Sequence, residues 1–393
     1  MVNPIRASRR PAVLVITAAA LVLSGCGAAE APTGASAGPE AAPGPAVPEP
    51  LVVTYDGGLQ VLDGRTLEVA RDIPLEGFNR INPAGDGRHV MVSTSDGFRV
   101  LDAVHPELTD IRFPGEKPGH VVHHDGRTAL FIDGTGEVLT FDPATLAEGP
   151  PETESHLSAE PHHGVAVELG NGELVTTLGN EEERTGIVVL DEQRREIARN
   201  EQCPGVHGES TAQGGAVVVG CEDGALVYRD GTITKITSPT EYGRIGNQAG
   251  SEHSPIVLGD YKQDEDAELE RPQQVSVIDT TNGTLRLVDL GTSYTFRSLA
   301  RGPEGEALVL GTDGALHEID PVAGRVVRSI PVIERWTEPL EWQQPRPALF
   351  VRGGTAYVTD PAGRAIHAVD LGTGDKTATA TLPAAPNELT GVS

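Results

Sequence analysis

A short phrase that occurs eight times constrains the fold of this chain more than any other feature. Each copy has alternating apolar residues, usually after a turn glycine, and ends in aspartate at Asp63, Asp102, Asp142, Asp191, Asp230, Asp279, Asp320 and Asp370. Neighbouring aspartates are 39 to 50 residues apart. A repeat of that length with several strands per unit is typical of a β-propeller. The sequence therefore predicts an all-β protein with eight blades. Seven blades is the alternative, if the unit around Asp279 or Asp370 is an insertion.

The first unit lacks an inner strand, and the far end of the chain offers one. The domain begins at Leu51–Thr54 and passes directly to the first repeat phrase at 59–62. Residues Asn387–Val392 form a short segment after the eighth unit. We expect this segment to complete the first blade and close the ring, so the propeller spans residues 51–393.

The N-terminal 25 residues read as a targeting segment rather than as part of the fold. Three arginines, the last of them Arg10, precede an apolar run at 12–23 that is too short for a membrane span. The run ends in Leu23–Cys26, which resembles a bacterial lipobox and implies cleavage before Cys26 and lipidation of its sulfur. An ordinary cleaved signal, with Cys26 incidental, is the alternative. Residues 26–50 are rich in Ala, Gly and Pro and predict a flexible tether. We therefore expect the protein at the extracytoplasmic face of the cell membrane, held by a lipid anchor.

Two further cysteines indicate a disulfide, and the net charge limits the class of binding partner. Cys203 and Cys221 are 18 residues apart and flank one predicted strand-turn-strand unit. In an oxidising compartment a disulfide between them is expected; a thiolate metal pair is the alternative, although CxxC spacing is missing. The formal net charge of −27 argues against nucleic acid as a partner. Beyond the lipid anchor, nothing predicts a membrane surface as a partner, and the expected state is a monomer.

Histidines cluster in three motifs of three consecutive units. The motifs read GHVVHHD from Gly119, EPHHG from Glu160 and GVHGE from Gly205. Each stands at or near the start of an inner strand, and inner strands line the central channel of a propeller. Aligning the motifs predicts that His120, His163 and His207 point to a common place near the axis.

Three imidazoles and one further group are a suitable set of ligands for Zn²⁺. His162, His124 and Glu209 are the candidates for a fourth ligand or an outer contact. A carboxylate that holds the far ring nitrogen of a histidine is also expected, and Glu209 or Asp125 could supply it. Because imidazole binds metal only when neutral, zinc affinity is expected to fall below about pH 6.5. Copper(II) and nickel would accept the same ligands. Structural packing of the histidines is the competing interpretation. We assign it to His89, His317 and His367, and expect His105, His156 and His253 in solvated loops.

Signatures of catalysis are missing. The predicted propeller domain has no GxSxG elbow, and the sequence has no HExxH or phosphate-binding glycine loop. A protein without catalysis is therefore expected. One alternative is an extracytoplasmic propeller enzyme, a lyase or a dehydrogenase, with Arg80 and Arg297 in its pocket. Another is an interaction scaffold that binds no metal.

The three histidine motifs, on an exported eight-bladed propeller with two cysteines nearby, resemble the AztD family of zinc metallochaperones. The resemblance covers about residues 51–393. It implies that His120, His163 and His207 or close neighbours hold Zn²⁺, that Cys203 and Cys221 are bridged, and that zinc passes to the solute-binding protein of a zinc ABC importer. One feature departs from the family. Residues 27–50 contain no histidine, whereas the family's metal-capturing members have a His-rich N-terminal segment.

Overall fold

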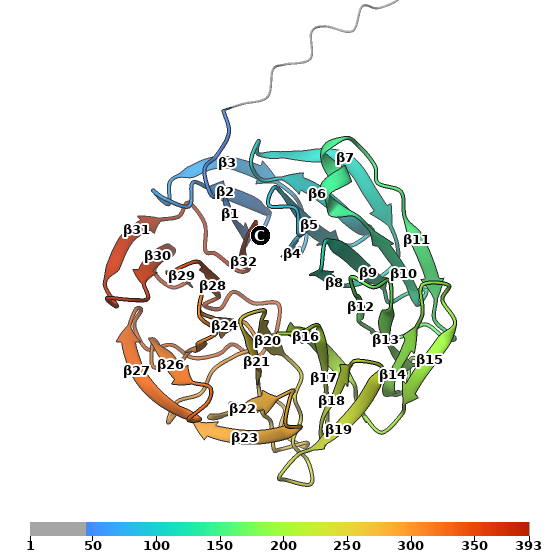
Figure 1. Cartoon of the computed structure of the whole chain (residues 1–393). Coiled ribbons are helices and arrows are strands. Elements are labelled where there is room, and N and C mark those ends of the chain that lie inside the picture. The colour runs from blue at the N-terminus through green and yellow to red at the C-terminus, as the bar shows by residue number, and fades with distance from the viewer. Residues whose placement is uncertain (1–44, 393) are drawn as a thin grey trace, which may run out of the picture. The chain divides into compact units, whose positions relative to one another are not determined.

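The computed structural model describes residues 45–392 and shows a ring of eight four-stranded antiparallel sheets around a central channel (Figure 1). The prediction of an all-β, eight-bladed propeller is therefore confirmed. One short 3₁₀ helix, η1 (Pro143–Ala147), is the exception among the described residues. The predicted signal peptide, Cys26 and the predicted tether up to residue 44 lie outside them. No helix in the described part is long and apolar enough to cross a membrane.

The blades repeat one order of strands from the channel to the rim. The innermost strands are β32 (Leu389–Gly391), β4 (Arg80–Pro83), β8 (Pro118–His124), β12 (Ala166–Glu168), β16 (His207–Ala212), β20 (Gln248–Ser251), β24 (Leu299–Arg301) and β28 (Leu349–Arg352). The second strands are β1 (Leu51–Tyr55), β5 (His89–Thr94), β9 (Arg127–Ile132), β13 (Leu174–Gly179), β17 (Ala216–Cys221), β21 (Ser254–Gly259), β25 (Ala307–Leu310) and β29 (Thr355–Asp360). The third strands are β2 (Gly58–Leu62), β6 (Gly97–Asp102), β10 (Glu137–Phe141), β14 (Arg184–Leu190), β18 (Gly224–Arg229), β22 (Gln274–Asp279), β26 (Ala315–Asp320) and β30 (Ala365–Asp370). The outer strands are β3 (Val69–Pro74), β7 (Glu107–Pro114), β11 (Glu154–Leu157), β15 (Glu196–Asn200), β19 (Thr232–Thr237), β23 (Thr284–Asp289), β27 (Arg325–Pro331) and β31 (Lys376–Thr381).

The ring closes as predicted, through the C-terminal strand. The first blade has the order β3-β2-β1-β32, so three of its strands come from the start of the domain and one from its end. In the antiparallel register Leu51 lies opposite Gly391 and Val53 opposite Leu389. Just before β1, Val47 donates its backbone N–H to the carbonyl of Val104. The chain therefore contacts the propeller a few residues before the predicted start at residue 51.

Each repeat phrase forms the third strand of a blade, and its aspartate accepts backbone hydrogen bonds in the turn that follows. Asp63, for example, accepts hydrogen bonds through Oδ1 from the backbone N–H groups of Arg65 and Thr66. The equivalent aspartates accept from backbone N–H groups two to four residues ahead in every unit but the one that ends in Asp230. Aspartate side chains favour such turns because they satisfy backbone donors that the strand no longer pairs. The repeat therefore marks the turn from each third strand into the outer part of its blade.

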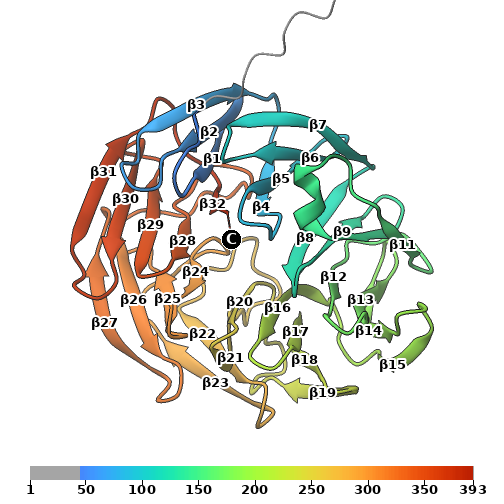
Figure 2. The ribbon, with the colours of Figure 1, turned by 45° about the horizontal axis from the view of Figure 1, so that its top comes forward.

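Successive sheets stand face to face around the ring (Figure 2), and apolar side chains pack between them. One such cluster joins Val175 and Val189 of the fourth blade to Val219 and Leu226 of the fifth, all of them at most 2% exposed. Burying each large apolar side chain contributes about 1.5–3 kcal/mol. The inner strands are consequently held firmly enough to present side chains at fixed positions around the channel.

Candidate metal centre

The three histidines of the motifs converge. One ring nitrogen from each of His120, His163 and His207 lies within 4.8 Å of the other two. Their ring centroids are 5.1–5.5 Å apart, and Nε2 of His163 is 3.1 Å from Nε2 of His207. Two nitrogens on one tetrahedral zinc ion are about 3.3 Å apart. The three side chains, called the histidine triad below, therefore meet with a spacing that suits a metal ion.

Irregular inner strands bring two of these side chains to the channel. The pairing of β8 with β9 shifts register between Pro118 and Val121, so His120 lies in a bulge. A second shift, between His207 and Glu209, places His207 at a bulge of β16. His163 precedes β12 and belongs to no strand. Bulges redirect side chains next to functional sites. Plain strand alternation therefore does not account for the convergence.

Each imidazole has a polar group beside its second ring nitrogen, and for two of them the two groups form a hydrogen bond. His207 donates from Nδ1 to the carbonyl oxygen of Gly246 over 2.6 Å, and Nδ1 of His163 is 2.5 Å from Oδ2 of Asp133. Nδ1 of His120 lies 3.0 Å from Oε2 of Glu209. A carbonyl oxygen can only accept, and a carboxylate normally accepts. The hydrogens on His207 and His163 are thereby assigned to Nδ1, and the Nε2 lone pairs face each other. Such a pair of lone pairs needs a proton or a cation between them.

Two glycines make room for these partners. A Cβ atom at Gly119 would lie 2.1 Å from Oδ1 of Asp133. Gly208 has a φ of +70°, and a Cβ there would lie 2.4 Å from the carbonyl oxygen of Gly246. Glycine is thus required beside His120 and His207 for close approach of the groups that orient His163 and His207.

The electrostatic environment keeps one ligand candidate neutral. Burial above all, and then the neighbouring His120, holds the pKa of His207 well below its ordinary value, although the hydrogen bond to Gly246 raises it. A neutral imidazole is the form that binds a metal. His207 is therefore ready to bind at neutral pH without first losing a proton.

Two reserve candidates lie elsewhere. His162 is buried, with Nδ1 2.9 Å from the carbonyl oxygen of Glu160 and Nε2 3.0 Å from Oγ1 of Thr177. It packs edge-on against the ring of Phe131 and is a packing residue, because both ring nitrogens already have partners. His124 lies at the opposite end of β8 from His120. His162 and His124 were proposed because they neighbour the motif residues in sequence, but His162 packs against Phe131 and His124 lies at the other end of β8 from the triad.

Most of the other histidines match their expected roles. His89, His317 and His367 are buried, and each has a side-chain partner: Asp86, Ser329 and Thr379 respectively. His253 is exposed in a turn. His156, however, belongs to the outer strand β11 and is half-buried, so its assignment to a loop was wrong.

Asp133 and Gly246 were missed from the sequence. Asp133 follows the end of β9 and Gly246 precedes β20, so both belong to a blade other than that of the histidine they contact. Only the pairing of blade with blade brings them together. Glu209, in contrast, was a candidate for holding a ring nitrogen, and it lies at His120. Asp125 was a candidate for the same task and lies away from the triad.

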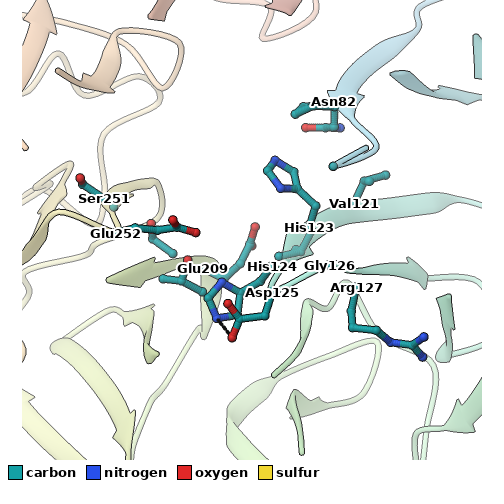
Figure 3. Close-up of a pocket in the computed structure, with 16 residues that line it drawn as sticks. Asn82, Val121, His123, His124, Asp125, Gly126, Arg127, Glu209, Ser251 and Glu252 are labelled. Carbon is teal, nitrogen blue, oxygen red and sulfur yellow. Dashed lines mark ion pairs between the residues drawn. The ribbon is translucent and has the colours of Figure 1, made fainter. Parts of the chain in front are cut away.

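A second group of possible ligands stands at the far end of β8. Nitrogen of His124 and carboxylate oxygens of Asp125 and Glu252 lie within 4.8 Å of one another. Figure 3 shows them on the wall of a pocket of about 600 Å³, with Nε2 of His124 3.2 Å from Oδ2 of Asp125. Asp125 and Gly126 both have positive φ, as a tight hairpin turn requires. Glu209 lines the same pocket and reaches from it toward His120.

The triad opens onto a pocket of about 300 Å³ at the end of the channel where the inner strands begin. His163, His207, Arg80, Lys262 and Trp342 line it. The two arginines considered for an enzyme pocket lie at this end of the channel, and both are paired. Nε of Arg80 is 3.2 Å, and Nη2 of Arg297 2.9 Å, from Oε1 of Glu388.

The predicted disulfide joins Cys203 to Cys221. It links the segment that leads into His207 to β17, the strand paired with β16. Both cysteines are fully buried in the cluster between the fourth and fifth blades. The bridge therefore restrains the backbone on the N-terminal side of one triad residue, and the alternative of a thiolate metal pair does not apply.

Comparison of the chain with known proteins bears on this site. No family model matches it. A curated relative, the zinc chaperone AztD of Citrobacter koseri, is 25% identical over 303 residues, which cover 74% of this chain and 69% of that protein. The predicted resemblance to AztD is confirmed. That relative is named as a chaperone and not as an enzyme, which agrees with the prediction of a protein without catalysis.

Solved structures give the same fold. Apo AztD from C. koseri matches with a TM-score of 0.76 and 21% identity, over 88% of this chain and 97% of that one. A second crystal structure of C. koseri AztD matches with the same score. The dihydro-heme d1 dehydrogenase NirN matches less well, with a TM-score of 0.60 and 14% identity, over 88% of this chain and 75% of that one. At these identities the structural likeness establishes the propeller alone.

Proposed function

We propose that this protein is a zinc-binding chaperone whose cargo ion is held by His120, His163 and His207. The observation that carries the proposal is the facing pair of Nε2 atoms of His163 and His207, 3.1 Å apart, while their Nδ1 atoms are taken by Asp133 and Gly246. The similarity to the zinc chaperone AztD supports the choice of metal.

The geometry suits a carrier rather than a permanent structural site. Structural zinc sites are closed by four protein ligands, whereas three ligands leave one position open. The side chain of His163 is 44% exposed, and it lines the 300 Å³ pocket together with His207. An incoming ligand can therefore reach the ion from the pocket and replace the histidines one at a time.

We further propose that the chaperone is anchored by lipid at Cys26 and delivers Zn²⁺ to the solute-binding protein of a zinc ABC importer. The lipobox-like Leu23–Cys26 and the AztD resemblance support this. Replacing Cys26 by Ala should release the protein from the membrane fraction. If the variant stays in the membrane fraction, the lipid anchor is contradicted, and this result is independent of zinc binding.

The test of the zinc site is a competition titration with a chromophoric chelator on protein purified without an affinity tag. The wild type should bind one Zn²⁺ tightly. His163→Ala should weaken that binding on the order of a hundredfold or more, because losing a ligand costs at least as much as losing the group that orients one. His105→Ala, which removes a half-buried imidazole paired with Asp102, is the matched control. Equal affinity in the three proteins would refute the assignment.

We infer that His124, Asp125 and Glu252 hold a second, weaker equivalent of zinc. His124 is buried, and its Nε2 lies 3.2 Å from Oδ2 of Asp125 without forming a hydrogen bond within residues 45–392. Both carboxylates are exposed and compete with water for the ion. Glu252→Gln should remove the weaker equivalent and leave the tight one unchanged. An unaltered weak equivalent would place it elsewhere.

A further inference from the structure

Three cations stand side by side next to the histidine triad. Arg244 and Lys262 face each other in an isolated antiparallel bridge, with both backbone hydrogen bonds at 2.9 Å. Residues directly opposite in such a bridge project to the same side, with their Cβ atoms about 5 Å apart. Arg184, at the start of β14, is the third: burial and then the charge of Arg244 lower its pKa. We call Arg184, Arg244 and Lys262 the basic strip.

Like charges in direct opposition destabilise a sheet, and here no ion pair offsets the repulsion. Within residues 45–392, none of the three side chains has a hydrogen bond or an ion pair, and all three are half-buried. Glu222 is close enough to act on the charge of Arg184 but makes no ion pair with it. By contrast, Arg80, Arg297 and Arg346 at the same end of the channel each pair with Glu388 or Glu338.

The other carboxylates near the strip are already engaged. Asp133 accepts from His163, and Glu338 is 2.7 Å from Nη1 of Arg346. Glu270 accepts from the backbone N–H groups of Gln263 and Asp264. The strip therefore keeps an unused capacity to bind anions, in a chain whose net charge is −27.

The strip borders the triad itself. Lys262 lines the 300 Å³ pocket together with His163 and His207. Arg244 lies two residues before Gly246, whose carbonyl oxygen accepts from His207. The strip spans the fourth to the sixth blade, which are neighbours in Figure 1, and the triad spans the third to the fifth. An anion on the strip therefore stands beside the open position of the proposed zinc site.

We propose that the basic strip binds carboxylate groups of the molecule that takes zinc from the triad. This rests on the proposed function of zinc transfer. Guanidinium groups pair with carboxylates through two parallel hydrogen bonds, and cations at a site mouth raise the rate at which anions arrive. An acidic acceptor, which the rest of this surface repels, is thereby guided to the one place where the ion is accessible.

The experiment compares two chelators that remove zinc from the loaded protein, followed by stopped flow at low ionic strength. EDTA is the polycarboxylate probe and 1,10-phenanthroline the uncharged one. The double variant Arg184→Gln/Arg244→Gln should slow removal by EDTA about tenfold, since electrostatic steering contributes at least that factor. Removal by phenanthroline should change less than about twofold. The ratio of the two rates cancels any change in the zinc affinity itself.

The matched control is Arg71→Gln/Arg325→Gln, which removes two exposed arginines from the outer strands β3 and β27. It changes the net charge by the same amount and should leave the ratio unaltered. Lys262→Gln alone should lower the ratio of the EDTA rate to the phenanthroline rate by a smaller factor. It is the second variant if the double variant folds poorly. An unchanged ratio in zinc-loaded strip variants would overturn the inference and leave the zinc site standing. A wild type that binds no zinc would overturn both.

Discussion

Asp133 offers the sharpest test of how the histidine triad is built. Its Oδ2 is 2.5 Å from Nδ1 of His163, and the side chain of His163 is 44% exposed while that of Asp133 is 15% exposed. Removing the group that orients a zinc-bound histidine typically costs 10–100-fold in affinity. Because water can partly replace the lost partner of so exposed a ring, Asp133→Asn should cost about tenfold, or about 1.4 kcal/mol. Asp133→Ala, which removes the acceptor altogether, should approach a hundredfold.

The assay is zinc competition against a chelator of known affinity, at one pH near 7.5. Asp313→Asn is the control, because Asp313 lies 3.2 Å from Nε2 of His317 in a similar pair outside the triad. Wild-type affinity in both Asp133 variants, with His163→Ala strongly impaired, would refute the reasoning. His163 would then need no orienting partner.

Gly119→Ala should weaken zinc binding in the same titration by displacing Asp133, with thermal stability changed little. Replacing Cys203 and Cys221 by Ser should lower the free energy of unfolding by about 3 kcal/mol in urea, as expected for an 18-residue loop; an unchanged midpoint would contradict this. Burial lowers the pKa of His367, so the unfolded state binds more protons below the ordinary value. Stability of the metal-free protein should therefore fall as the pH drops below about 6.5, and less steeply in His367→Gln; parallel curves would exclude this residue as a cause.

Much of the fold could be predicted because its signals are local and repeated. The phrase that ends in Asp63 and its seven copies encode a strand and the turn after it, so eight independent observations indicate one unit. The closing strand at 389–391 was predictable because the first unit visibly lacks a partner. His156 shows the limit, since a short outer strand with exposed residues carries no clear alternation.

The part of the candidate site that could be predicted follows one rule: equivalent positions in successive blades lie close together near the axis. That rule found His120, His163 and His207. It could not find Asp133 or Gly246, because their roles depend on contacts between blades that no periodicity encodes. The bulge at Gly208 inserts one residue into a strand, and strict alternation gives no warning of it. The basic strip was missed for a similar reason, since its members come from three separate loops or strand ends.

The pairing of β32 with β1 has a consequence for aggregation. A protein shortened before Leu389 would keep all eight repeat phrases, yet β1 would lose the neighbour that covers its inner side. The backbone N–H and carbonyl groups of Val52, which lies opposite Thr390, would then be free to pair with a strand of another molecule, as exposed sheet edges do. Three residues at the end of the chain thus separate a self-contained ring from a template for polymerisation.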